Sequence, residues 1–233
     1  MMFFRLSLVG LLVVGAAAQT DPSRDALFAA VQRGAVGDVE RLLDRGASPN
    51  LVDAEGTPAL MAATLFANAD MVNVLLKHGA DPNRVGPAGT TALMWAVPDV
   101  EKVRLLVAGG ANVNARSDSE RTPLLAAASF PRTVELLRLL LDRGADLRAQ
   151  DRTGATALAL AVRSADVEVV RFLVDKGLDP NALSPGARRV AFARYDRPTT
   201  DYIMSKGLNP SPDVLITTAT WQPAELVARW IES

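Results

Sequence analysis

The sequence predicts an all-α solenoid of stacked helix-turn-helix units joined by short hairpin loops. A fixed interval of about 33 residues is typical of repeat proteins, in which each unit buries its apolar faces against its neighbours. A six-residue phrase returns at that interval, with its leucine at Leu27, Leu60, Leu93, Leu124 and Leu158. A Gly-Ala pair keeps the same interval, at Gly46, Gly79, Gly110 and Gly144.

The first helix of each unit is expected to begin at the phrase. In Thr122-Pro123-Leu124 the threonine can cap the helix while proline takes the first helical position, where its missing N–H costs nothing. Thr91, Thr156 and Asp25 are predicted to cap in the same way. Pro58 occupies the cap position of the second unit, whose threonine lies one residue early, so the start of that helix stays open.

The second helix of each unit is predicted from an amphipathic run. Residues 166–176 place apolar side chains three and four apart, with charges between them. The glycine that follows can adopt the left-handed conformation that ends a helix. A basic residue usually precedes it, which favours the negative end of the helix: Arg45, His78, Arg143 and Lys176.

Together the phrase and the Gly-Ala pair resemble the ankyrin repeat, whose pattern is T-P-L-H-x-A. The fullest matches are residues 89–96 and 74–83, and the resemblance covers roughly residues 22–211. An ankyrin-type solenoid implies hairpin loops that project sideways from the helices. Their expected positions are residues 54–56, 87–89, 118–120 and 152–154.

Three departures from the pattern affect its geometry. Glu120 stands where the other hairpins have glycine, so a distorted or rebuilt hairpin is expected there. The unit of Gly89 is shortened around residues 98–102, and the unit of Glu120 is lengthened around residues 130–133. Both changes fall between the two helices of a unit, so altered turns with a preserved stacking register are predicted.

The expected organisation is a signal peptide at residues 1–18, a short linker at 19–23, ankyrin repeats at 24–211 with a degenerate last unit, and a C-terminal capping helix pair at 212–233. Arg5 precedes an apolar run, and small residues at Ala16 and Ala18 fit a cleavage site. The alternative is an uncleaved membrane anchor, although the run is shorter than the roughly 20 residues that span a bilayer.

The end of the sequence leaves two interpretations open. The apolar side chains of residues 226–231 either cap the last repeat or pack against a further domain that follows residue 233. The apparent signal peptide, together with the absence of cysteine, favours an exported protein, periplasmic or secreted.

Known catalytic and metal-binding motifs are missing from the sequence. It contains no cysteine and a single histidine, His78, which is placed as an exposed helix-end residue. No phosphate-binding glycine loop or nucleophile elbow occurs. We therefore expect no enzyme activity, metal or cofactor. The formal charge of −1 gives no electrostatic reason to expect nucleic acid or a membrane as partner.

The resemblance implies that a partner protein binds the concave surface formed by the hairpin tips and the ends of the inner helices. The residues carried over to that surface are Leu65, Phe66, Asp99, Arg121, Phe130, Arg152, Arg163 and Tyr195. The aromatic groups are candidate anchors. Alternatively, Phe66 and Phe130 fold back over the adjacent loop, Trp95 packs within its helix, and the two hairpin arginines are solvated.

The sequence therefore predicts a non-catalytic, monomeric scaffold that binds another protein. Two further hypotheses remain: an N-terminal regulatory segment of a larger exported enzyme, and an inhibitor or immunity-type protein that blocks an enzyme. Small-molecule binding would need a closed pocket with convergent polar groups, which the repeat pattern does not suggest.

Overall fold

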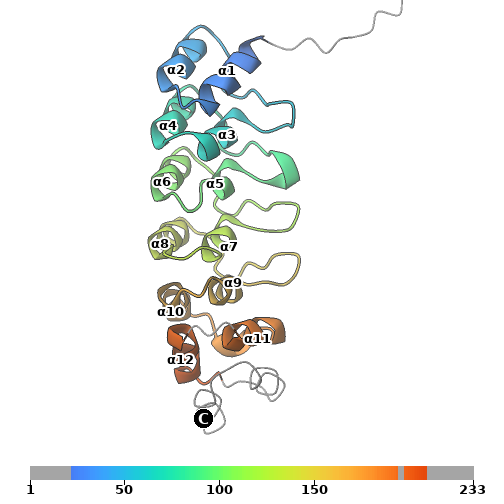
Figure 1. The fold of residues 1–233 in the computed structure, drawn as a ribbon, viewed down its shortest axis with the longest axis vertical. Helices are drawn as coiled ribbons and strands as arrows, with labels where there is room; N and C mark the ends of the chain where they lie inside the picture. Colours follow the sequence, from blue (N-terminus) through green and yellow to red (C-terminus); the bar gives the residue numbers. More distant parts are fainter. Residues whose placement is uncertain (1–21, 194–196, 209–233) are drawn as a thin grey trace, which may run out of the picture.

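The computed structural model describes residues 22–193 and 197–208. These residues form two columns of helices, stacked unit by unit (Figure 1). The inner column contains α1 (Pro22–Gln32), α3 (Ala59–Phe66), α5 (Ala92–Trp95), α7 (Pro123–Ala128), α9 (Ala157–Ser164) and α11 (Pro185–Ala193). The outer column contains α2 (Val36–Asp44), α4 (Ala69–Lys77), α6 (Val100–Ala108), α8 (Val134–Asp142), α10 (Val167–Asp175) and α12 (Arg197–Ser205).

Each inner helix packs on the inner helices of the neighbouring units, and each outer helix does the same in its own column. Hairpin loops project from the inner column on the side away from the outer helices (Figure 1). Short 3₁₀ turns occur at η1 (Pro87–Gly89) and η2 (Pro180–Ala182). Within the described ranges the architecture is the predicted all-α solenoid.

The core lies between the two columns and follows the sequence repeat. All five leucines of the phrase are at most 2% exposed. The outer helices bury the apolar stripe expected from their amphipathic pattern, as Val169, Val170 and Leu173 do in α10. Each helix is short, so its stability depends on this packing against the neighbouring units.

The glycines end the outer helices as predicted. Gly46, Gly79, Gly110, Gly144, Gly177 and Gly207 all have positive φ, between 83° and 98°. The basic residues before them occupy the C-cap positions, as His78 does after α4 and Lys176 after α10. There each positive charge lies beside the unpaired carbonyls of the helix end.

An asparagine ladder ties consecutive units together along the turns that follow the outer helices. The side chain of Asn50 donates to the carbonyl of Gly79 (3.1 Å) and accepts from the N–H of Asp81 (2.8 Å). Asn83 and Asn114 repeat both bonds with the next units, at 2.7 to 3.0 Å. Arg148 stands at the following position, so the ladder is interrupted there.

The predicted helix caps are only partly confirmed. Thr122 and Thr156 accept the expected backbone hydrogen bonds. Thr91 does not, because the N–H of Met94 bonds to its carbonyl instead, and the buried Thr91 hydroxyl has no partner. The prediction for Asp25 was also wrong, since α1 already runs from Pro22 and places this residue inside its first turn.

The second unit and the two altered units keep the stack intact. Pro58 is the residue before α3, which starts at Ala59. In the shortened unit α5 has only 4 residues, yet it still packs on α3 and α7. In the lengthened unit Arg132 takes a left-handed conformation (φ 61°) in the turn after α7. The prediction of altered turns with preserved stacking is confirmed.

The predicted signal peptide (1–18) and the predicted capping helix pair (212–233) lie outside the described residues, as does most of the linker at 19–23. Their boundaries stay predictions. Residues 183–206, which the sequence marks as a degenerate unit, contain the helix pair α11 and α12.

Candidate functional site

Four hairpins line one side of the inner column (Figure 1). We name them the first hairpin (53–57), second hairpin (86–90), third hairpin (117–121) and fourth hairpin (151–155). In each, the N–H of the first residue donates to the carbonyl of the last, at 2.9 to 3.2 Å. All four lie at the predicted positions. The third is not rebuilt, because Glu120 adopts the left-handed conformation (φ 61°) that glycine takes elsewhere.

The first residue is charged in two of the four hairpins and uncharged in the other two. Asp53 and Asp151 each accept two backbone N–H groups of their own hairpin, at 2.7 to 3.0 Å. In the third hairpin the hydroxyl of Ser117 accepts one such bond, from Arg121 (3.2 Å). The second hairpin has Gly86 and therefore no side-chain acceptor. The two middle hairpins thus lack the carboxylate that the outer two carry.

Backbone hydrogen bonds join the tips of the last three hairpins. The N–H of Asp118 donates to the carbonyl of Ala88 (3.0 Å), and the N–H of Arg152 donates to the carbonyl of Ser119 (2.9 Å). The first of these contacts requires a glycine beside it, because a Cβ on Gly89 would lie 2.7 Å from the backbone nitrogen of Asp118. These bonds hold the three tips in one rim before any ligand binds.

A pocket of about 430 Å³ opens between this rim and the inner helices. Met94 and Trp95 of α5 and Ala126 of α7 line it from the helix side. Arg121 and Arg152 line it from the third and fourth hairpins. The lining therefore combines an indole ring with two guanidinium groups, a set that suits recognition of an apolar group next to an anion.

Arg121 is held in place by its neighbours. Its guanidinium donates to the hydroxyl of Ser129, which in turn donates to the carbonyl of Leu125 (2.9 Å). Arg121 also acts on Asp151. Burial tends to raise the pKa of Asp151, but hydrogen bonds from Thr153 and Ala155 and the nearby Arg121 charge outweigh it, so that pKa is lowered. Asp151 consequently stays ionised within its own hairpin.

The structure brings some of the predicted partner-binding residues together and separates others. Arg121 and Arg152 share the pocket described above, whereas Arg163 lines a different hollow between α9 and α11. Tyr195 lies outside the described residues. Asp99 caps α6 by accepting from the N–H groups of Glu101 and Lys102, so its carboxylate has a structural task.

The apolar candidates are exposed at the ends of their inner helices. Phe66 is 57% exposed, Leu65 46% and Phe130 42%. None of the three belongs to the buried core. Much of each phenylalanine surface is therefore exposed to solvent, and the choice between an anchor and a side chain folded over its loop stays open.

Trp95 packs against the hydrophobic core, as one of the two sequence-based alternatives has it, and it also lines the pocket. When the units are aligned on the leucine of the phrase, Trp95 occupies the position of Ala62, Ala126 and Leu160. Arg121 ends the third hairpin, where the other three hairpins end in Thr57, Thr90 and Ala155. Comparing units position by position would have marked both residues as departures from the repeat pattern.

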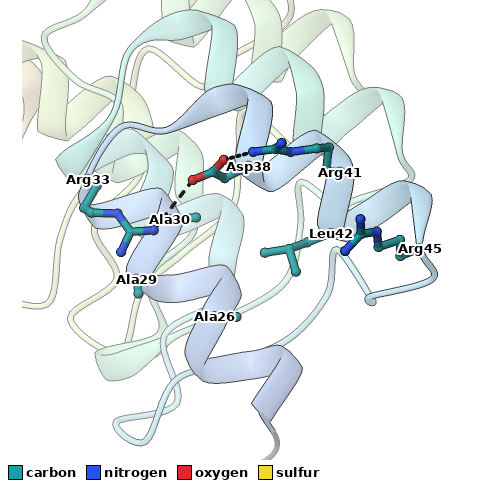
Figure 2. A pocket seen from close by; sticks show the side chains of 8 residues that line it. All are labelled: Ala26, Ala29, Ala30, Arg33, Asp38, Arg41, Leu42 and Arg45. Carbon is teal, nitrogen blue, oxygen red and sulfur yellow. Dashed lines mark hydrogen bonds and ion pairs between the residues drawn. The ribbon is translucent and has the colours of Figure 1, made fainter.

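A second hollow, of about 420 Å³, lies between α1 and α2 at the end of the stack (Figure 2). Asp38 forms ion pairs with Arg33 (3.7 Å) and Arg41 there, while Arg45 follows the end of α2 (Figure 2). These side chains are well exposed to solvent. Because two of its three arginines already have a carboxylate partner, this hollow is a weaker candidate than the pocket at Trp95.

His78 has a structural role. Its Nδ1 lies 2.9 Å from the carbonyl of Val74 and its Nε2 lies 3.1 Å from the carboxylate of Asp44. The bond to Val74, followed by the bond to Asp44, raises the pKa of His78 above its usual value. Within residues 22–193 and 197–208 no cluster of three potential metal ligands occurs. Nor does that part of the chain contain a helix with the length and hydropathy needed to cross a bilayer.

Stacked helix pairs with rigid hairpins define a helical repeat protein with an elongated binding surface. A family model described as ankyrin repeats (3 copies) matches residues 4–86, 27–117 and 93–184. The chain therefore belongs to the ankyrin repeat family. Ankyrin repeats generally mediate protein–protein interaction, and the family is generally non-catalytic.

Relatives share the repeats with this chain. A putative ankyrin repeat-containing protein of Treponema pallidum (strain Nichols) is 34% identical over 66% of this chain and 41% of its own length. Human ankyrin repeat and SOCS box protein 6 is 41% identical over 36% of this chain and 21% of its own length. A protein of Dirofilaria immitis named L-asparaginase is 31% identical over 67% of this chain and 21% of its own length. The chain thus matches less than half the length of each of these relatives.

Proposed function

We propose that this protein is a non-catalytic scaffold that binds one partner protein along the groove formed by the hairpin tips and the inner helices. The observation that carries the proposal is the pocket at Trp95, because hydrogen bonds between the tips preform it. A preformed surface loses little conformational entropy on binding, so more of the contact energy appears as affinity.

The exposed phenylalanines support the same surface. Phe66 ends α3 and Phe130 lies in the turn just after α7, and neither belongs to the buried core. Aromatic groups on a groove wall are common anchors, since few residues carry most of the binding energy of an interface.

The test is affinity capture of a partner by the whole protein, followed by binding measurements on the purified partner. Phe66→Ala and Phe130→Ala are expected to weaken binding at least about fivefold each, the usual effect of removing an anchor. Glu40→Ala and Lys77→Ala serve as controls, because both residues are exposed on outer helices. Equal affinity of all four variants and the original protein would refute the groove as the binding surface.

A second candidate is a regulatory segment of a larger exported enzyme. The observation that favours it is the match to much longer relatives, one of which is named L-asparaginase. The mass of the native protein, measured with an antibody to the repeats, separates the two: a species near 24.8 kDa or slightly smaller supports the scaffold, and a much larger one supports the enzyme segment.

We also propose export to the periplasm or the medium, on the layout of residues 1–18. N-terminal sequencing of the mature protein tests it, with residue 19 expected as the first residue. A mature protein that still begins at Met1 would contradict cleavage.

A further inference from the structure

The pocket at Trp95 is built from departures from the repeat pattern. Trp95 introduces a large ring where the next unit has Ala126, and the small side chain beside the ring leaves space in front of it. Arg121 adds a charge at a position that is Thr57 in the first hairpin and Ala155 in the fourth. The buried leucines are unchanged in these units, and Trp95 both packs against the core and lines the pocket.

The charges of the pocket do not cancel. Two cations, Arg121 and Arg152, face one anion, Asp118, so the lining carries +2 − 1 = +1. No carboxylate stands at the start of the second or third hairpin, because Gly86 and Ser117 occupy those positions. Asp151, at the start of the fourth hairpin, interacts with the Arg121 charge but accepts hydrogen bonds within its own hairpin and does not line the pocket.

The two arginines are placed differently. Arg152 is exposed, and its side chain has no hydrogen bond or ion pair to any other described residue. Its backbone N–H is fixed to the carbonyl of Ser119, so the side chain starts from a rigid point of the rim. Arg121 is oriented by the uncharged hydroxyl of Ser129, and the carboxylate near enough to feel its charge is that of Asp151, which does not line the pocket.

Asp118 limits what the pocket accepts. One of its carboxylate oxygens would clash with a Cβ placed on Gly89, so this anion lies against the second hairpin. A second carboxylate near that wall would be repelled. The wall formed by Arg121 and Arg152 attracts an anion, since a guanidinium can donate two parallel hydrogen bonds to a carboxylate.

We infer that the pocket receives a single Asp or Glu side chain of the partner protein, next to an apolar residue that packs on Trp95. The inference rests on the proposed function and adds the chemistry of the recognised segment. The carboxylate pairs with Arg152 and Arg121, and the neighbouring apolar side chain fills the space over Ala126. A run of several acidic residues is disfavoured by Asp118, and a basic segment is repelled by both arginines.

The test uses an unphosphorylated random peptide library selected on the whole protein, with single peptides then resynthesised for affinity measurements. Selection is expected to enrich one Asp or Glu adjacent to an aliphatic or aromatic residue. Arg152→Gln is expected to lower the affinity for the enriched peptides at least about tenfold, as for loss of a charge-assisted hydrogen bond. Trp95→Ala should weaken them similarly, and replacing the acidic residue of the peptide by its amide should do the same.

Arg148→Gln is the matched control, because Arg148 is an exposed arginine of the same unit that does not line the pocket. Circular dichroism of Arg152→Gln checks that the fold is retained. Peptides without an acidic residue, or with affinity unchanged by Arg152→Gln, overturn the inference. If those peptides are still weakened by Phe66→Ala or Phe130→Ala, the groove stands and only the carboxylate specificity fails. If neither set of variants matters, the groove fails as well.

Discussion

Asn83→Ala is expected to destabilise the protein by removing one step of the asparagine ladder. The side chain donates to the carbonyl of Gly110 (3.0 Å) and accepts from the N–H of Asn112 (2.7 Å). Each hydrogen bond contributes about 1 kcal/mol net. The carbonyl of Gly110 and the N–H of Asn112 are exposed, so water can replace the lost side chain. We therefore expect the free energy of unfolding to fall by about 1–2 kcal/mol for the two bonds together.

The ladder also predicts a stabilising change. Arg148 occupies the same turn position, and its N–H bonds to Asp146 (2.9 Å) as the N–H of Asn83 bonds to Asp81 (2.9 Å). Because the backbone geometry is shared, Arg148→Asn places an amide where the carbonyl of Gly177 can accept from it. We expect the free energy of unfolding to rise by about 1–2 kcal/mol, because the new asparagine would form the same two kinds of hydrogen bond that Asn83→Ala removes.

Urea unfolding followed by circular dichroism at 222 nm measures both changes, with the midpoint and slope fitted together. Asn181→Ala is the control, because Asn181 has the same turn position but no side-chain hydrogen bond to another described residue. We expect that control to stay within about 0.5 kcal/mol of the original protein. The reasoning fails if Asn83→Ala costs no more than Asn181→Ala, or if Arg148→Asn gives no gain.

Three further predictions concern single contacts. Gly89→Ala should cost about 1–3 kcal/mol more than Gly154→Ala in the same urea assay, because both residues have positive φ (68° and 76°) but only the first would clash with the next hairpin. His78 has a raised folded pKa, so its contribution to stability is present below about pH 6.5 and lost as pH rises through the folded pKa. The unfolding free energy of the original protein should therefore fall relative to that of His78→Gln between about pH 6 and 8, and a constant difference would contradict this. Lys102 is 9% exposed and donates to a carbonyl of the last turn of α3 (2.9 Å). Urea unfolding should therefore show that Lys102→Ala lowers the free energy of unfolding by about 1–3 kcal/mol, whereas substitution of the exposed Lys77 by alanine lowers it by under about 0.5 kcal/mol.

The repeat could be predicted from sequence because the residues that specify it act locally or through burial. A leucine returning at a fixed interval must be buried in every unit, and a glycine after an amphipathic run ends the helix at whichever unit it occurs. Thr91 shows the limit of this reasoning. A capping bond to Thr91 needs a free N–H in the first turn of α5. In this four-residue helix of the shortened unit, the N–H of Met94 already bonds to the Thr91 carbonyl, and the local sequence does not reveal that.

The candidate site was harder to predict, because it depends on side chains from several units at once. Arg121 and Arg152 are 31 positions apart in sequence and were each interpretable as solvated charges. They meet in one pocket because hydrogen bonds between hairpin tips bring the third and fourth hairpins together. No local pattern encodes that contact, although the absence of aspartate at Gly86 and Ser117 was visible in the sequence.

The position of the ladder break separates the binding surface from the last described units. The bonds of Asn50, Asn83 and Asn114 join the turns up to Asp146, so the second and third hairpins lie before the break. The fourth hairpin follows Arg148 directly and is tied to the third by the bond from the N–H of Arg152 to the carbonyl of Ser119. Without a ladder step at Arg148, the units beyond it depend more on helix packing, and local opening there leaves the rim intact. Amide hydrogen exchange should therefore be faster in α11 and α12 than in α5 and α7. Arg148→Asn should slow exchange in α11 and α12 and leave the affinity of pocket-binding peptides unchanged, because the change strengthens a junction outside the pocket. Coupled changes in exchange and affinity would show instead that the stack opens as one unit.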